Sequence, residues 1–315
     1  MIVTVTLNPS LDRALEIDRL SRGEVLRAAA PVRLDPGGKG INVTRALLAN
    51  GVPSTAVAPC GGVEGTQLVR LLRAERVDLV AVPIIGRTRS NITLAEPDGT
   101  ITKLNEPGPT LTPGEFAAVT EKVLDAAGST RWVVACGSTP PDLPVAMFAR
   151  LCQRAVDAGL PLAVDTSGPA LRVAAEAGAT LVKPNREELA EVVGAPLLTL
   201  DDVVDAAQQL RAWGAGTVLV SLGADGAALV NASGVFTGDA PVADPRSPVG
   251  AGDALLAGFL AAGAEGTTAL AEALAWGAAA VRLPGSRMPR PGDLVRDQVR
   301  IHSWPATDRL LLPRV

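Results

Sequence analysis

Apolar residues occur along the chain in short continuous runs rich in β-branched residues, which alternate with longer stretches of amphipathic spacing. The short runs predict strands and the longer stretches predict helices. The expected strands are Ile2–Leu7, Thr55–Cys60, Trp132–Cys136, Leu162–Asp165, Leu181–Lys183, Val218–Leu222 and Ala227–Val230. The expected helices include Thr66–Arg76, Pro113–Ala127, Pro144–Ala158 and Leu200–Trp213. Because the strand runs are apolar at nearly every position, they predict an α/β fold with a doubly wound, mostly parallel sheet that binds ligands at the carboxyl ends of its strands.

Two segments depart from this alternation. Leu15–Leu34 mixes polar and apolar residues with weak strand character, whereas Arg89–Leu104 has two runs around a Pro97-Asp98-Gly99 turn, which is typical of a β-hairpin. Residues 13–36 and 87–106 are therefore expected to form a small β lid that excludes water from a reaction. An ordinary edge hairpin fits the same pattern. Because no repeat or low-complexity linker interrupts the chain, residues 1–315 are expected to form a single domain.

Composition narrows the function classes. The chain has 315 residues, 47% of them apolar, and a net charge of −4, which argues against nucleic acid or an anionic membrane as a partner. The first residues lack a basic, cleavable signal, and no apolar run is long enough to span a bilayer, so we expect a cytoplasmic protein. The three cysteines have no paired spacing and predict free thiols. The single histidine, His302, is expected in a solvated tail, so the chemistry must use Asp, Glu, Lys, Arg, Asn and the backbone.

The most informative stretch is Val249–Asp253, which reads Val-Gly-Ala-Gly-Asp and runs into the apolar residues 254–260. The two glycines allow a sharp turn, and a helix that starts there directs unpaired N–H groups and the positive end of its dipole toward an anion. A bound phosphate would repel Asp253 as a ligand, but the carboxylate suits a proton acceptor for a hydroxyl that attacks the phosphate. A plain N-terminal cap is the alternative that this stretch favours by itself.

A second glycine-rich turn, Pro36–Gly40, precedes a predicted helix at Ile41–Asn50. It departs from the P-loop pattern because Lys39 is followed by glycine instead of serine or threonine. It predicts a phosphate or hydroxyl site of another kind with Lys39 as a point charge, although a capped helix with an exposed lysine fits as well. Asp12, in a turn after the first strand, and Arg89, at the entry to the hairpin, are weaker candidates for binding ligand hydroxyls and phosphate.

Two further turns suit a nucleotide. Lys183–Glu188 follows a strand and opens a helix, with Asn185 and Glu188 three positions apart. An amide and a carboxylate suit Mg²⁺ held largely through its waters beside nucleotide phosphates, and the same pair suits a capping box. The glycines of Ser221–Gly226 permit close approach of a base or ribose, while a plain hairpin turn is the alternative. Together, two anion sites and a base suggest two phosphorylated ligands and transfer between them.

The chain resembles the PfkB, or ribokinase-like, carbohydrate kinases over nearly its whole length. It is most similar to the branch of bacterial 1-phosphofructokinases and tagatose-6-phosphate kinases, in which valine precedes the Gly-Ala-Gly-Asp run. Six motifs in the family's order carry the resemblance. They are Thr6–Asp12, Pro36–Val43, Thr88–Asn91, Leu104–Pro109, Lys183–Glu188 and Val249–Asp253.

The resemblance implies a role for each candidate residue. Asp253 is expected to take the proton from the sugar hydroxyl, and the backbone of Gly250, Ala251 and Gly252 is expected to form the anion hole. The residues expected to hold the sugar and its existing phosphate are Asp12, Gly38, Lys39, Asn42 and Arg89. The residues expected to bind ATP are Asn185, Ser221, Gly223 and Gly226. Mg²⁺ is expected at Asn185 and Glu188, through water.

The implied activity is ATP-dependent phosphorylation of a ketohexose monophosphate, with fructose 1-phosphate converted to fructose 1,6-bisphosphate. Tagatose-6-phosphate kinase and 6-phosphofructokinase activities are alternatives, because the two ends of a ketohexofuranose are alike. A non-catalytic sugar-phosphate sensor is disfavoured because it needs no base such as Asp253. The family's lid strands often pair between subunits, which implies a homodimer. Thr139, Asp142 and Pro248 depart from the branch's pattern, and residues 285–289 match it loosely, which leaves adenine contacts there open.

Overall fold

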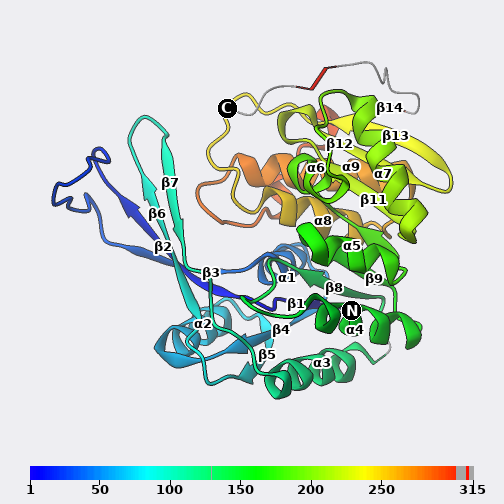
Figure 1. Ribbon diagram of the computed structural model, residues 1–315. Coiled ribbons are helices and arrows are strands. Elements are labelled where there is room, and N and C mark those ends of the chain that lie inside the picture. Colours follow the sequence, from blue (N-terminus) through cyan, green and yellow to red (C-terminus); the bar gives the residue numbers. More distant parts are fainter. Residues whose placement is uncertain (129, 303–309, 312–315) are drawn as a thin grey trace.

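The computed structural model describes residues 1–128, 130–302 and 310–311. Its strands form two sheets, one of ten strands and one of four (Figure 1). The strands are β1 Ile2–Val5, β2 Ser10–Glu16, β3 Arg33–Gly37, β4 Ser54–Cys60, β5 Asp78–Pro83, β6 Arg89–Ala95, β7 Ile101–Asn105, β8 Trp132–Cys136, β9 Leu162–Asp165, β10 Leu181–Val182, β11 Thr217–Ser221, β12 Ala227–Asn231, β13 Gly234–Asp239 and β14 Arg300–His302. The α-helices are α1 Lys39–Ala49, α2 Gly62–Ala74, α3 Pro113–Ala127, α4 Val145–Asp157, α5 Gly168–Glu176, α6 Arg186–Val193, α7 Leu200–Trp213, α8 Ala251–Ala261 and α9 Gly266–Val281.

The large sheet has the strand order β14-β13-β12-β11-β10-β9-β8-β1-β4-β5. The strands from β5 to β11 run parallel, and β12, β13 and β14 continue the sheet antiparallel. The expected doubly wound, mostly parallel sheet is therefore confirmed. The chain adds β4 and β5 on one side of β1 and then returns to add β8 on the other side. The strand order thus reverses between β1 and β8, which is the place where ligands bind in open α/β sheets.

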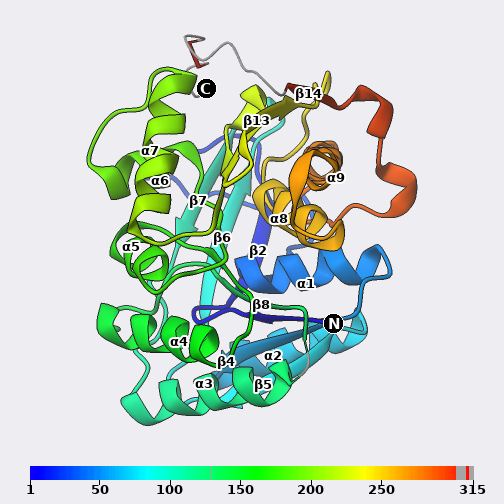
Figure 2. The same ribbon diagram turned by 90° about the vertical axis from the view of Figure 1, so that its right-hand side faces the viewer.

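Both faces of this sheet are covered by helices, as Figure 2 shows. Helices α3 to α7 pack on one face, and α1, α2, α8 and α9 pack on the other. Successive residues of one strand enter opposite cores: Val133 and Ala135 of β8 belong to the core under α3–α7, whereas Val134 and Cys136 belong to the core that contains α1, α8 and α9. Burial on both sides explains why the strands are continuous apolar runs instead of alternating ones.

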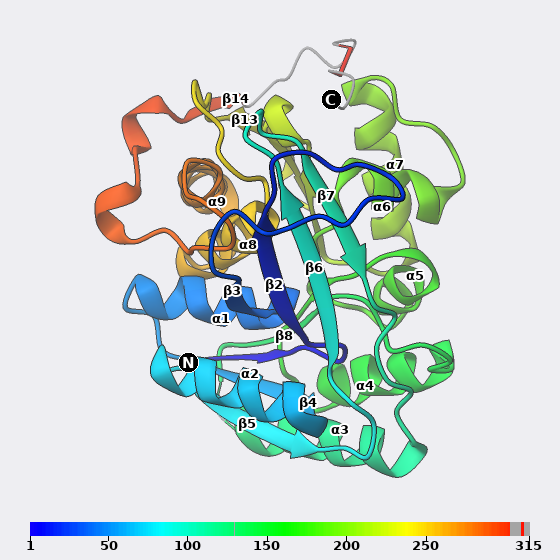
Figure 3. The same ribbon diagram turned by 90° about the vertical axis from the view of Figure 1, so that its left-hand side faces the viewer.

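The four-stranded sheet, in the order β3-β2-β6-β7, stands against one side of the molecule and faces the viewer in Figure 3. It joins two segments that are far apart in sequence, because β2 pairs in parallel with β6. The hairpin prediction is confirmed, since β6 and β7 are antiparallel neighbours. Asp12 was expected in a turn, and this was wrong: β2 already begins at Ser10, because its partners β3 and β6 extend the pairing toward the core. The function of this sheet as a lid stays a prediction.

Some features of the structure differ from the sequence predictions. β5, at the sheet edge, is not among the expected strands, although residues 79–82 form a short apolar run, Leu-Val-Ala-Val. His302 is exposed to solvent as expected, but it lies in β14 and not in a tail, and its Nε2 is 3.2 Å from Asp239 Oδ2. Cys60, Cys136 and Cys152 are free thiols, as expected. Across the described ranges, none of the helices combines the length and apolar character needed to cross a membrane.

Candidate active site

A cavity of about 360 Å³ opens where the strand order reverses. Asn8 follows β1, Gly137 and Ser138 follow β8, and all three line this cavity. Four of the predicted site residues also line it, namely Gly38, Lys39, Arg89 and Glu188. Residues from both sheets therefore converge on one cleft at the carboxyl ends of the central strands.

Helix α8 begins as an anion-binding turn should. Its N-cap residue, Gly250, has a left-handed φ of 80°, and no side chain caps the helix. A Cβ at Gly250 would lie 2.8 Å from Met288 Cε, the end of a flexible side chain that can shift, so the positive φ is what favours glycine here. The Ala251 N–H donates to the Pro248 carbonyl at 3.3 Å, whereas no protein acceptor is recorded among the described residues for the N–H groups of Gly250 and Gly252, which are left for an outside acceptor. Lys183 lies under this turn, with its Nζ 3.6 Å from a Cβ placed at Gly252.

Asp253 does not cap this helix, so the capping alternative is wrong. Its side chain is 6% exposed and accepts a hydrogen bond from Asn42 Nδ2 at 2.9 Å. Burial raises the pKa of Asp253 to about 6, the nearby charge of Asp165 adds to the effect, and Lys39, Asn42 and Lys183 oppose it. The carboxylate is thus ionised at neutral pH yet basic enough to accept a proton, which is the property of a general base.

Lys39 is neither an exposed lysine nor a free point charge. Its Nζ lies 2.8 Å from Asp165 Oδ1 and 2.9 Å from Glu188 Oε1, at the wall of the cavity. Burial would lower the pKa of Lys39, but the two carboxylates outweigh it and raise the pKa well above its usual value. The ammonium group therefore stays charged and contributes a fixed positive charge to the cleft.

Asp165 is the centre of a buried ionic cluster that sequence reasoning missed. Its Oδ2 lies 3.0 Å from Lys183 Nζ, and the side chains are 1% and 3% exposed. Burial alone would raise the pKa of Asp165, but Lys183 and Lys39 outweigh it and hold the pKa below its usual range. A signal was present, because Asp165 ends β9 and Lys183 follows β10, so both lie at the ligand edge of the sheet.

The start of α1 packs tightly against β1, which explains its glycines. Gly38 has a φ of 123°, and a Cβ at this position would lie 2.6 Å from Thr6 Cγ2. A Cβ at Gly40 would lie 2.6 Å from Thr6 Oγ1. This close packing of α1 against Thr6 brings Lys39 to the wall of the cavity and places Asn42, one turn later, beside Asp253.

The four-stranded sheet contributes Asp12 and Arg89. Asp12 Oδ1 accepts hydrogen bonds from Ser10 Oγ at 2.7 Å and Asn91 Nδ2 at 2.9 Å, and burial raises the pKa of this carboxyl group. Arg89 donates through Nη1 to the Glu106 carbonyl at 3.1 Å. Within the described chain, Arg89 Nε and Asn91 Oδ1 are buried without a hydrogen-bond partner. Buried polar groups of this kind normally find a partner, so both atoms suit contact with a polar ligand.

Asn185 and Glu188 form a capping box at α6, so this alternative is confirmed. Glu188 Oε2 accepts from the Asn185 N–H at 2.9 Å, while Oε1 is bound to Lys39. A carboxylate has about four acceptor sites, so lone pairs remain for a hydrated cation. No group of three or more acidic, cysteine or histidine side chains that suits a metal occurs among the described residues. The donor set therefore fits a Mg²⁺ held through its waters rather than one in a protein cage.

The Ser221–Gly226 turn lies at the same edge of the sheet. Ser221 ends β11 and forms a β-bridge with Asn185, and a short 3₁₀ turn at Gly223–Asp225 leads into β12. The hairpin alternative is thus also correct. Gly226 has a φ of 91°, and a Cβ there would overlap the Gly238 carbonyl. The β-bridge places this turn beside the α6 cap at Asn185.

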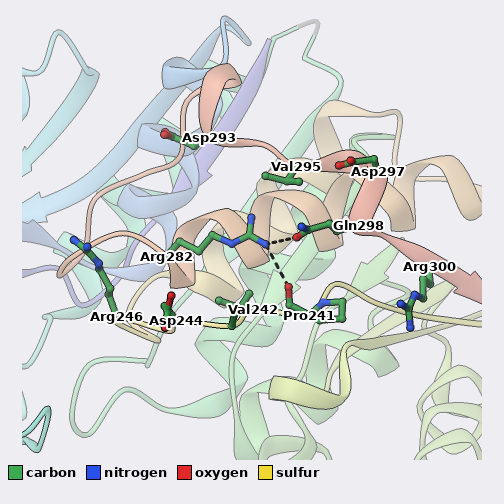
Figure 4. A pocket seen from close by; sticks show the side chains of 11 residues that line it. Pro241, Val242, Asp244, Arg246, Arg282, Asp293, Val295, Asp297, Gln298 and Arg300 are labelled. Carbon is green, nitrogen blue, oxygen red and sulfur yellow. Dashed lines mark hydrogen bonds between the residues drawn. The ribbon is translucent and has the colours of Figure 1, made fainter.

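A larger cavity of about 900 Å³ lies beside the loop that runs from β13 toward the α8 turn. Figure 4 shows Arg282, at the end of α9, reaching toward that loop. Its Nη2 donates to the Pro241 carbonyl at 3.3 Å and to Gln298 Oε1 at 2.8 Å. None of the predicted site residues lines this cavity, which is separate from the cleft around Lys39.

Comparison with known proteins agrees with this geometry. Residues 5–291 match the pfkB family carbohydrate kinases. The chain is 34% identical over 261 residues to 1-phosphofructokinase of Bacillus subtilis, covering 83% of this chain and 85% of that protein. It is 38% identical over 258 residues to ATP-dependent 6-phosphofructokinase isozyme 2 of Escherichia coli, covering 81% and 83%. The crystal structure of phosphofructokinase-2 from Escherichia coli in complex with substrates and products superposes with a TM-score of 0.87 at 35% identity, covering 93% and 96%.

The chain therefore belongs to the pfkB family of carbohydrate kinases. Its fold is ribokinase-like, and it is a sugar-phosphate kinase, a phosphotransferase that acts on an alcohol group.

Proposed function

We propose that this enzyme transfers the γ-phosphoryl group of ATP to the 6-hydroxyl of fructose 1-phosphate and forms fructose 1,6-bisphosphate. The observation that carries the proposal is Asp253, a buried carboxylate with a pKa of about 6 in the first turn of an uncapped, glycine-rich helix. A base of this basicity beside an anion-binding turn suits a reaction in which a hydroxyl attacks a phosphate. The name of the Bacillus subtilis relative supports fructose 1-phosphate as acceptor.

In this proposal Asp253 takes the proton of the attacking hydroxyl while the oxygen bonds to the γ-phosphorus and ADP leaves. The N–H groups of Gly250, Ala251 and Gly252 stabilise the charge on the phosphoryl oxygens. Lys183, 3.6 Å from a Cβ at Gly252, adds positive charge beneath them. Most of the catalysis then comes from positioning and charge, with the base contributing about 10²–10⁴-fold.

The sugar phosphate is assigned to the cleft between the two sheets. Asp12 accepts hydrogen bonds from sugar hydroxyls, and Asn42 and the Gly38 backbone border the reacting end. The existing phosphate pairs with Arg89, whose Nε is buried without a partner within the described residues, and with the charged Lys39. An arginine suits this task because its planar fork matches phosphate oxygens.

ATP is assigned to the edge formed by Asn185, Ser221, Gly223 and Gly226. Asn185 and Glu188 hold Mg²⁺ through its waters, and the ion, when bound, neutralises charge on the nucleotide phosphates. The family name and the ATP-dependent relative support ATP as the phosphoryl donor. The matched test is Glu188→Gln, for which we expect a higher Mg²⁺ requirement than for the control Glu191→Gln, at an exposed residue of the same helix.

One observation favours a second acceptor. A relative that covers 81% of the chain at 38% identity is a 6-phosphofructokinase, so fructose 6-phosphate phosphorylated at its 1-hydroxyl is the alternative, with tagatose 6-phosphate as a third candidate. The deciding experiment measures kcat/KM by ADP release for the three sugar phosphates, with and without Mg²⁺. We expect fructose 1-phosphate to exceed the other two at least tenfold. A reversed order would replace the acceptor, and no turnover with any would refute the kinase assignment.

We also propose a homodimer through residues 13–36 and 87–106, acting as a lid. Five large apolar residues of this region are exposed, and a second subunit would cover them: Leu20 (41%), Val25 (84%), Val32 (45%), Ile101 (38%) and Leu104 (56%). Sedimentation should give twice the chain mass, and Leu104→Glu should shift the protein toward monomer. The control Leu198→Glu, at an apolar residue 63% exposed outside the lid, should not.

A further inference from the structure

Arg45 of α1 makes hydrogen bonds to Asn42 of the same helix, to Glu75 at the end of α2 and to Ser286 in the segment after α9. Its Nε and Nη2 bind both carboxylate oxygens of Glu75, at 2.6 and 2.9 Å. Its Nη1 donates to Asn42 Oδ1 at 3.3 Å and to the carbonyl oxygen of Ser286 at 3.2 Å. The Arg45 side chain is only 9% exposed, so these contacts are made with little competition from water.

The contact with Asn42 fixes the orientation of a side-chain amide. An amide has an acceptor end and a donor end of nearly the same shape, and its hydrogen-bond partners decide which way it faces. An arginine is a donor only, so Arg45 selects the Oδ1 end of Asn42. The Nδ2 end is thereby directed at Asp253 Oδ2, which it meets at 2.9 Å.

We propose that Arg45 is a positioning residue for the phosphoryl transfer. It holds the Asn42 amide with its N–H toward Asp253 and thereby keeps that carboxylate ionised and in a fixed orientation. The inference rests on the proposed function of Asp253 as base. Arg45 contacts neither substrate nor the reacting atoms and acts only through Asn42. If the amide turned over, its oxygen would face the carboxylate, and the repulsion would favour the protonated form.

The other groups around Asp253 limit the size of the effect. The charged groups that act on it are Asp165 at the end of β9, Lys39 in α1 and Lys183 after β10, and the buried Cys136 thiol of β8 feels the same charges. They remain unchanged when Arg45 is replaced. We therefore expect the pKa of Asp253 to rise by about 0.5–1 unit, comparable to the loss of one hydrogen bond to a charged group.

Arg45 also holds the segment behind the α8 turn, and this structural role needs its own control. Ser286 is two residues before Met288, which packs against Gly250. Asn50, at the end of α1, holds the same segment by donating from Nδ2 to the Pro289 carbonyl at 2.8 Å. Asn50 has no recorded contact with Asn42 or Asp253, so Asn50→Ala loosens the segment without releasing the amide.

The test compares pH profiles of kcat for the wild type, Arg45→Met and Asn50→Ala on the same sugar phosphate. We expect Arg45→Met to shift the acid limb upward by about 0.5–1 pH unit and so to lower kcat about two- to fivefold at pH 6, with the sugar-phosphate KM changed less than threefold. Asn50→Ala should leave the acid limb in place. An equal shift in both variants, or no shift in Arg45→Met, would overturn the proposal. The phosphate group of the sugar substrate also titrates, but it does so equally for every variant, so its effect on the pH profile cancels in the comparison.

A mutant cycle tests whether Arg45 acts through Asn42. In an Asn42→Ala background, adding Arg45→Met should move the acid limb no further, since the amide is already gone. A further shift of similar size would contradict the proposed route. If Arg45→Met fails to fold, Glu75→Gln weakens the anchor of Arg45 without removing it, and a smaller shift in the same direction is expected.

The pKa of Asp253 can also be measured without turnover. Carboxyl ¹³C signals are titrated in the full-length wild type and in Arg45→Met, with Asp253→Asn used to assign the signal. A higher midpoint in Arg45→Met supports the inference even if no sugar phosphate is turned over, in which case only the proposed function fails. Identical midpoints, with normal wild-type turnover, refute the inference and leave the proposed function standing.

Discussion

The side-chain amide of Asn42 donates to the carboxylate of Asp253 across 2.9 Å and so joins the N-terminal turns of two helices separated by 211 positions in the sequence. Both helices, α1 and α8, start at a glycine without a side-chain cap. In the proposed function, these two uncapped helix starts would each face an anionic ligand, one from the sugar phosphate and one from ATP. The hydrogen bond from Asn42 to Asp253 would then hold the two binding sites in a fixed relation to each other.

The first prediction concerns Asp253 as base. Asp253→Asn keeps the size of the side chain and can still accept from Asn42, but it cannot take a proton. We expect kcat to fall about 10²–10⁴-fold while the Kd values of both substrates, measured by calorimetry, change little. The exposed Asp201→Asn serves as control and should retain wild-type kcat. Near-normal turnover of Asp253→Asn would remove the base from the mechanism.

The second prediction concerns the pH dependence of activity. Because the pKa of Asp253 is raised to about 6, the carboxylate is protonated below that pH and then lacks the lone pair that accepts the hydroxyl proton. We therefore expect kcat to decline as the pH falls through about 6 and to level off above about 7. A profile that stays flat down to pH 4.5 would show that no group with this pKa acts in the reaction.

The third prediction links the same group to stability. The native pKa of about 6 exceeds the usual 3.8, so the native state binds the extra proton between these values and the ionised carboxylate destabilises the fold above them. Asp253→Asn should therefore raise the free energy of unfolding by about 1–3 kcal/mol at pH 8. The difference should shrink as the pH falls through 6 and vanish near 3.8. Urea unfolding at pH 8 and pH 5 checks this, and an unchanged or lower stability at pH 8 would contradict it.

The fourth prediction concerns the ionic cluster. Asp165→Asn removes the only carboxylate recorded as paired with Lys183 in the described structure, and Lys183 is 3% exposed. An uncompensated buried ammonium group should destabilise the fold by about 3–5 kcal/mol, seen as a lower urea midpoint with an unchanged slope. Breaking the solvent-exposed pair of Arg154 with Glu121, by Glu121→Gln, should have little measurable effect. Comparable losses of stability in both variants would show that burial does not determine how much stability is lost when an ion pair is broken.

The fifth prediction separates backbone strain from crowding in α1. Gly38→Ala meets both obstacles, since φ is 123° and the new Cβ would lie 2.6 Å from Thr6 Cγ2. Gly234→Ala, at the start of β13, meets a similar φ of 131° but with nothing within 4 Å. We expect thermal unfolding to show a loss of about 2–5 kcal/mol for Gly38→Ala and about 1–2 kcal/mol for Gly234→Ala. Equal losses would mean that contact with Thr6 adds nothing.

Much of the fold could be predicted because its cause is local. Strands such as β8 and β9 are buried on both faces, so burial leaves a continuous apolar run that the sequence displays directly. Glycine-rich helix starts at Gly38 and Gly250 are visible for a similar reason, since a positive φ favours glycine wherever the rest of the chain lies. The edge strand β5 is not among the predicted strands, although its Leu-Val-Ala-Val run at residues 79–82 is a signal of the same kind.

The sequence by itself determined the doubly wound sheet, the two glycine turns and, through six motifs, the residues proposed for the site. Only the tertiary structure decided how those residues are paired. It gave Lys39 two carboxylate partners, centred the buried charges on Asp165, set Asp12 in a strand, and turned Asn42 toward Asp253. The reason is physical: a turn or a strand is set by neighbours in the chain, whereas the pKa and orientation of a buried polar group depend on charges and donors brought to it by distant segments.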